Sequence, residues 1–268
     1  MIRDITIGQY YPAESVIHRL DPRVKLVGTL TFIISLFLHR SFLMYLVAAV
    51  FLTIVIKASK VPFRFMIKGL KAIMVLLLIT VVFNMFLTPG TPLIRIWKLT
   101  LTVEGVKQAA FMAIRLAFLI VGSSVMTLTT TPNHLTDGME KGLAPLNKLH
   151  VPVHEVSMIM SIALRFIPIL LEEKDKIMKA QEARGADFDS GNLIQKAKSL
   201  VPLLVPLFIS AFRRANDLAM AMEARGYRGG EGRTKMKPLI YQKRDRMAYG
   251  VLLGYLAVMI LVGQFAPF

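Results

Sequence analysis

Residues 26–56 read LVGTLTFIISLFLHRSFLMYLVAAVFLTIVI and carry no acidic or basic residue other than His39 and Arg40. A transmembrane helix needs about 20 apolar residues, with a range of about 17–25. The stretch is long for one tilted helix, and it yields two short helices if the chain turns at His39-Arg40. In either case the stretch indicates a chain that is built into a membrane.

Basic residues on both sides of this stretch favour two helices. Lys and Arg concentrate in the cytoplasmic loops of membrane proteins. Three basic residues precede the stretch and five follow it: Arg19, Arg23 and Lys25, then Lys57, Lys60, Arg64, Lys68 and Lys71. With both flanks in the cytoplasm the chain must cross the membrane twice, so we expect a helical hairpin that turns at His39-Arg40.

Three further apolar stretches complete the expected membrane region. Together with the hairpin they predict five spans, at about 24–39, 42–57, 68–88, 107–128 and 247–265. The N-terminus would then be cytoplasmic, while the loop around Pro89 to Pro92 and the C-terminus would face outward. Arg115 lies inside the fourth span, where a charged residue is a functional candidate by default. We expect Arg115 to reach the outer membrane surface by extending its side chain along the helix.

The composition agrees with a membrane protein and argues against several other classes. Apolar residues make up 54% and charged residues 19%, and 33 Lys and Arg face 17 Asp and Glu, for a net charge of +16. With so apolar a chain, this excess indicates cytoplasmic membrane loops rather than contact with nucleic acid. The absence of cysteine excludes disulfides and thiolate metal sites.

No motif in the chain points to catalysis. There is no Walker A sequence and no nucleophile signature. His150 and His154 have the spacing of a helical metal pair, but Pro152 lies between them and favours exposed histidines at a loop-to-helix junction. We therefore expect a non-enzymatic protein with no cofactor and no metal ligand.

The charge is concentrated between the fourth and fifth spans. We accordingly expect three regions: a membrane region 1–128, a cytoplasmic helical region 129–246, and a final span in 247–268. The middle region predicts two long amphipathic helices, one from about Pro152 to Arg184 and one that ends near Arg225. Apolar residues recur at helical spacing in the first of them: Ile159, Ala163, Phe166 and Leu170. The charge run from Glu172 to Lys176 is typical of a solvated helix face.

The two long helices are expected to end in the same four residues. Glu182-Ala183-Arg184-Gly185 closes the first helix, and Glu223-Ala224-Arg225-Gly226 closes the second. One interpretation is a stop signal, since Gly permits the left-handed conformation that ends a helix and Arg suits the negative end of the helix dipole. The other interpretation is docking, because a guanidinium at a helix tip can pair in a bidentate way with carboxylates of a partner.

The pair of motifs resembles the transmembrane T component of energy-coupling factor (ECF) transporters. That family carries two Ala-Arg-Gly motifs at the ends of long cytoplasmic coupling helices, here Ala183-Arg184-Gly185 and Ala224-Arg225-Gly226. Further stretches match the family's habits: His18 to Lys25, Thr130-Thr131-Pro132, Ala163 to Pro168, Ala180-Gln181, and Glu223 to Tyr227.

The resemblance implies a role in the cell membrane of a prokaryote. It implies a scaffold that joins two ATP-binding-cassette ATPases to a membrane-embedded S component, which captures a vitamin or a nickel or cobalt ion. Arg184 and Arg225 are implied to insert into acidic grooves of the two ATPases. The alternatives are a pathway-forming permease of a conventional ABC importer, a membrane-anchored binder of nucleic acid or anionic lipid, and a membrane enzyme.

The expected topology can be tested with single cysteines in intact cells. Cysteines at Ser15 and Gly230 should be protected from an impermeant thiol reagent, and one at Thr91 should react, because only the last faces outward. Labelling at Gly230 from outside the cell would contradict a cytoplasmic middle region.

Overall fold

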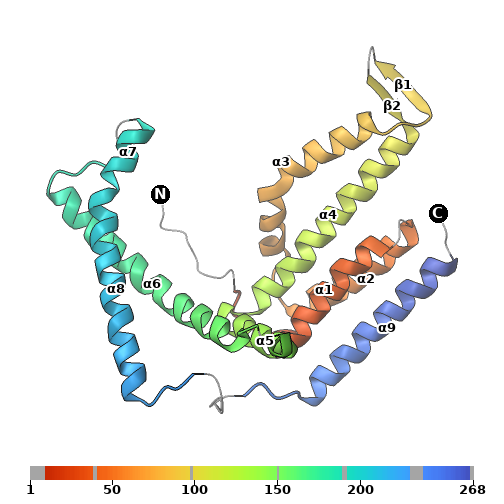
Figure 1. The fold of residues 1–268 in the computed structure, drawn as a ribbon. Coiled ribbons are helices and arrows are strands. Elements are labelled where there is room, and N and C mark those ends of the chain that lie inside the picture. Colours follow the sequence, from red (N-terminus) through yellow and green to blue (C-terminus); the bar gives the residue numbers. More distant parts are fainter. Residues whose placement is uncertain are drawn as a thin grey trace. The chain divides into compact units, whose positions relative to one another are not determined.

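The computed structural model describes residues 10–38, 41–96, 99–149, 151–188, 192–229 and 238–265. These residues are almost wholly helical (Figure 1), which confirms the predicted all-α membrane fold. The helices are α1 (Pro22–Leu38), α2 (Phe42–Ser59), α3 (Phe63–Leu87), α4 (Val103–Thr129), α5 (Pro132–Leu143), α6 (Val153–Ala183), α7 (Leu193–Ser199), α8 (Val201–Ala224) and α9 (Lys243–Phe265), with a 3-10 helix at Ala144–Leu149.

Among the described residues, five helices are long and apolar enough to cross a membrane, but they are not the five that the sequence predicts. They are α2, α4, α6, α9 and the stretch Ile194–Ala224, which contains α8. The α3 helix would add a sixth if counted as one span, since its parts Phe63–Lys71 and Ile73–Leu87 meet at 61°. Two of these five, α6 and the stretch that contains α8, belong to the region that the sequence predicts to lie outside the membrane. Each lies in a helical stretch of 31 residues with a segment apolar enough to cross a membrane, whereas α1 has only 17 residues.

The chain forms two compact units. The first, called here the membrane unit, comprises the described residues of Met1–Gly142 and Leu239–Phe268, and the second, called the arm unit, those of Leu143–Pro238. In the membrane unit α4 packs against α1, α2 and α3, and α9 packs against α1 and α2. The separate helices α1 and α2 confirm two helices in residues 26–56, while the expected turn at His39-Arg40 lies outside the described residues.

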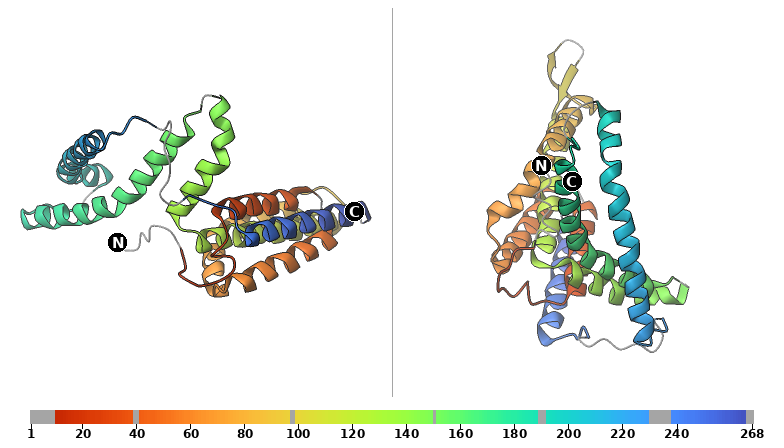
Figure 2. Two further views of the ribbon diagram at one scale, coloured as in Figure 1. Left: turned by 90° about the horizontal axis from the view of Figure 1, so that it is seen from below. Right: turned by 90° about the vertical axis from the view of Figure 1, so that its left-hand side faces the viewer.

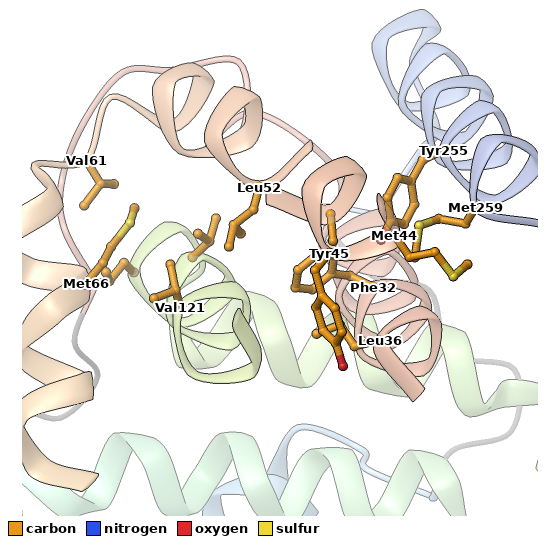
Figure 3. Close-up of a cluster of buried hydrophobic side chains, with 13 residues drawn as sticks. Phe32, Leu36, Met44, Tyr45, Leu52, Val61, Met66, Val121, Tyr255 and Met259 are labelled. Atoms are coloured by element: carbon orange, nitrogen blue, oxygen red, sulfur yellow. The ribbon is translucent and has the colours of Figure 1, made fainter. Parts of the chain in front are cut away.

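The core of the membrane unit is apolar and draws on five helices (Figure 3). Its largest fully buried side chains include Met66 from α3 and Met259 from α9. The Phe51 and Tyr255 rings stack with their centroids 4.2 Å apart. The Tyr255 hydroxyl also lies 2.7 Å from the Ser35 hydroxyl, so its polar end is satisfied inside the core.

The segment between α3 and α4 contains a β-hairpin, whereas the sequence predicts only a loop there. Strands β1 (Pro92–Ile96) and β2 (Leu99–Thr102) pair antiparallel. The Thr102 hydroxyl accepts a hydrogen bond from the Gly105 N–H and caps α4. The Glu104 carboxylate accepts hydrogen bonds from the Thr91 N–H and hydroxyl, which ties the hairpin to the start of α4.

The expectation that Arg115 extends to the membrane surface is wrong. Arg115 is only 8% exposed, and its Nε donates a hydrogen bond of 3.0 Å to the Tyr45 hydroxyl. Its guanidinium also lies over the Phe37 ring, 5.0 Å from the centroid. Because α4 begins at Val103, Arg115 sits about 18 Å along the helix, too far from either end for the side chain to leave the bundle.

A buried carboxylate fastens the start of α9 to the start of α1. Asp245 is 1% exposed, and its two oxygens accept hydrogen bonds from the Asp21 N–H at 2.9 Å and the Gln242 N–H at 2.7 Å. Asp21 in turn forms an ion pair of 2.8 Å with Arg23, whose guanidinium lies over the Tyr241 ring at 3.8 Å. We call these five residues the clasp.

Within the clasp, the ion pair of Asp21 and Arg23 stays charged at physiological pH. Burial raises the pKa of the Asp21 carboxyl, but hydrogen bonds from Arg23 outweigh it, so the pKa lies below the ordinary 3.8. A lowered pKa gives stability that is present above the ordinary value and is lost as the pH falls through the lowered one. The ion pair of Asp21 and Arg23 therefore contributes to stability across the whole physiological pH range.

Replacing Asp245 with Ala should destabilise the membrane unit, because two N–H groups lose their acceptor. An unsatisfied buried donor costs about 1–3 kcal/mol. Asp245→Asn retains one acceptor oxygen and should cost less, and Arg246→Ala, at an exposed neighbour, should cost little. Thermal unfolding of the full chain in mild detergent measures the order. An Asp245→Ala variant that unfolds at the wild-type temperature would show that the clasp does not hold α9.

Candidate partner-docking site

The candidate site is built on α6 and α8, which cross in the arm unit (Figures 1 and 2). The Glu173 carboxylate on α6 accepts a hydrogen bond from Ser210 at 2.7 Å and pairs with Arg214 at 2.6 Å, both on α8. Eight residues further along α6, Gln181 donates a 3.5 Å hydrogen bond to the Pro202 carbonyl. Residue numbers rise along α6 as they fall along α8, so the two helices cross in opposite directions.

The interaction at this crossing was missed in the sequence analysis. The charge run of residues 172–176 is typical of a solvated face, and Glu172, Asp175 and Lys176 are indeed exposed. Glu173 differs because it faces α8. The available signal was the pair Ser210 and Arg214, which lie four residues apart and so project from one face of a helix. No sequence rule, however, pairs that face with Glu173.

The predicted ends of both helices are confirmed, and their backbones match. At the first, the Gly185 N–H bonds the Glu182 carbonyl and the Ala186 N–H bonds the Gln181 carbonyl. At the second, the same two bonds run from Gly226 to Glu223 and from Tyr227 to Met222. This is the Schellman motif, with glycine in the left-handed region at φ 90° and 72°.

The cap geometry presents Arg184 and Arg225 in the same way. Their backbone angles are φ −89°, ψ 3° and φ −90°, ψ 9°. Both residues are exposed, as are Ala183 and Ala224 before them. Neither guanidinium forms an ion pair with another residue of the part of the chain that is described. Each helix therefore ends in a positively charged tip.

The two tips lie at opposite ends of the helix pair. Gln181, three residues before Arg184, contacts Pro202 near the start of α8. Arg225 follows 23 residues later, a distance of about 35 Å along a helix with a rise of 1.5 Å per residue. One acidic groove could not receive both arginines, so any partners that bind the tips do so at two separate places.

Apolar side chains of both arm helices remain exposed. On α8 a shallow groove runs along one face, and Phe208, Ile209 and Phe212 on it are 61%, 54% and 68% exposed. On α6 the Ile159 side chain of the predicted apolar stripe is 62% exposed. An exposed apolar surface of this kind marks contact with a partner or a membrane.

Two positions that the sequence analysis singled out, His150 and Gly230, lie outside the described residues. His154 is the second residue of α6. Within the described ranges, no group of three His, Cys, Asp or Glu side chains is arranged to hold a metal ion. Charged helix tips and exposed apolar faces are chemically suited to binding a partner.

Substitution of the cap glycines should weaken the tips. Gly185→Ala and Gly226→Ala place a side chain in the left-handed region, at a cost of roughly 1–2 kcal/mol each. Gly142→Ala is the matched control, since Gly142 has open space around it and lies within α5, where Ala is favoured over Gly. Hydrogen exchange of the last turns of α6 and α8 measures the effect. Equal protection in the variants and the wild type would show that these glycines do not set the helix ends.

Comparison with known proteins places the chain in a family. The family described as "Cobalt transport protein" (CbiQ) matches residues 13–236. The energy-coupling factor transporter transmembrane protein EcfT of Clostridium kluyveri is 59% identical over 264 residues, 97% of each chain. The proteins of the same name from Ruminiclostridium cellulolyticum and Bacillus subtilis are 50% and 48% identical, over 98% and 91% of this chain and 98% and 93% of their own length. The chain therefore belongs to the EcfT family, the transmembrane T components of energy-coupling factor transporters.

Proposed function

We propose that this T component is the scaffold that couples two cytoplasmic ATPases to a membrane-embedded S component. In this role it binds no substrate tightly and hydrolyses no ATP. It holds the complex together and transmits ATP-driven movement. The substrate would be a vitamin or a transition-metal ion, the latter in keeping with the description of the CbiQ family.

The observation that supports this function best is the pair of matching arginine tips. Arg184 and Arg225 have the same cap geometry, are both exposed, and lie about 35 Å apart along α8. Two similar ATPase subunits would each need one such tip, in the same local conformation, at separate points. A simple helix stop signal requires neither the exposure nor the separation.

The crossing of α6 and α8 suits a coupling element. Glu173, Ser210 and Arg214 join the two helices by charge-assisted hydrogen bonds. A push on one tip would move both helices about this joint. The exposed apolar faces around Phe208 and Ile159 would receive the S component, so that movement at the ATPases reaches the subunit that carries the substrate.

The same properties bear on how α6 and α8 meet the membrane. Each has an apolar half long enough to enter it, and α6 also carries the charge run 172–176, which lipid excludes. We propose that both lie along the cytoplasmic membrane surface with their apolar faces toward lipid and the S component. The N-terminus and residues 129–246 would then be cytoplasmic.

Substitution of the tip arginines tests the proposed function. Loss of one partner from a desolvated charge pair costs about 2–5 kcal/mol, since the other charge is left buried. Arg184→Ala or Arg225→Ala should therefore weaken copurification of the ATPases and substrate uptake, and the double variant much more. Lys should rescue poorly, because an ammonium cannot make the bidentate contact.

Exposed basic residues on the same helices provide the controls. Lys179→Ala on α6 and Arg213→Ala on α8 also remove one positive charge each, but not from a tip. At matched expression both controls should leave copurification of the ATPases unchanged, because neither residue lies at a tip. Normal assembly and uptake in the Arg184→Ala, Arg225→Ala double variant would mean that the arginines only end their helices.

A further inference from the structure

The membrane unit contains an apolar cavity that its packing leaves open. It lies among α1, α2, α4 and α9 and has a volume of about 390 Å³. Its floor includes Phe32 and Val125, which are 3% and 5% exposed. Its rim includes Ile54 on α2 and Val251 on α9, which are 60% and 63% exposed. The cavity therefore runs from the exposed surface of α2 and α9 into the core of the membrane unit.

Two basic side chains, Lys25 and Arg244, line this largely apolar cavity. Lys25 donates hydrogen bonds from Nζ to the carbonyls of His18 and Thr129, at 3.2 and 2.8 Å, which hold it in place. Arg244 is different, because its Nε is buried yet has no hydrogen-bond acceptor among the described residues. A buried guanidinium N–H without an acceptor is costly, so the site favours a ligand that supplies one.

The neighbouring carboxylates are already engaged. Asp245, next to Arg244 in the chain, accepts a hydrogen bond from a backbone N–H group with each of its two carboxylate oxygens. Asp21 pairs with Arg23, and Glu14 pairs with Arg19. The acceptor for Arg244 is therefore not supplied by any of these three groups.

The cavity also lies at the basic end of the membrane unit. Its lining comes from the starts of α1 and α9 and from the ends of α2 and α4. That end carries a group of basic residues: Arg19, Arg23, Lys25, Lys57, Lys60, Lys243, Arg244 and Arg246. A positive end beside an apolar cavity matches an anionic lipid, whose charged group and hydrocarbon chain are joined in one molecule.

We propose that this cavity binds one anionic phospholipid. An acyl chain fills the space between Phe32 and Val251, and a phosphate oxygen accepts the free N–H of Arg244. A soluble anion would leave the apolar wall uncovered, and a purely apolar ligand would leave Arg244 without an acceptor. The lipid thereby completes the packing of α9 against α1 and α2.

Native mass spectrometry of the delipidated full chain tests the site, with phosphatidylglycerol and phosphatidylcholine of the same acyl chains as probes. One phosphatidylglycerol should bind per chain, about fivefold more tightly than phosphatidylcholine. Arg244→Gln should remove that preference, whereas Arg246→Gln, at an exposed neighbour outside the lining, should keep it. Ala248→Phe fills the cavity and should weaken the binding of both lipids. Ala257→Phe, at an exposed position on the same helix, should leave the binding of both unchanged.

Several outcomes would overturn the proposal. Equal binding of the two lipids by the wild type would do so, as would equal effects of Arg244→Gln and Arg246→Gln. If Ala248→Phe does not fold, the Arg244→Gln comparison still decides. A photoreactive amino acid at Val251 distinguishes the occupants in native membranes, since crosslinking to protein in place of lipid would assign the cavity to a partner subunit.

Discussion

The carboxylate of Asp245 joins two points of the chain that lie 224 residues apart. The position of α9 in the membrane unit depends on this contact, because α9 follows the whole arm unit and no short loop sets its position. By accepting the Asp21 N–H, Asp245 brings the first residues of α9 to the first residues of α1. The two helices then run in the same direction from a common point.

With their starts held together, α1 and α9 can complete the core. The Ser35 and Tyr255 hydroxyls meet, Tyr255 stacks on Phe51, and the Leu252 side chain reaches Gly28 closely enough that a Cβ there would lie 3.3 Å away. Between α1 and α4 the approach is tighter, since a Cβ on Gly122 would lie 2.6 Å from the Phe32 ring. Such packing matters in lipid, where apolar surfaces gain little by leaving the solvent and helices associate through close contact.

The helices of the arm unit are held together differently. Its two long helices meet at one crossing, and much of their apolar surface stays exposed. Glu173 binds to Ser210 and Arg214 there and fixes the place where α6 and α8 cross. Held together at this crossing, the pair presents two separate helix ends. This suits an element that acts through its tips and faces more than through a core of its own.

The sequence by itself determined the helical membrane fold, the split of residues 26–56 into two helices, and the matching helix ends at Gly185 and Gly226. Each is a local property, set by apolar length, flanking charge or the conformational freedom of glycine, so neighbouring residues contain the information. Membership of the family could also be predicted from the sequence, since the resemblance rests on short motifs. Only the tertiary structure decided that Arg115 is buried against Tyr45, that Glu173 faces α8, and that Asp245 fastens α9 to α1. These contacts join residues 41 to 224 positions apart, and which buried polar groups meet depends on how whole helices pack, which no local pattern encodes.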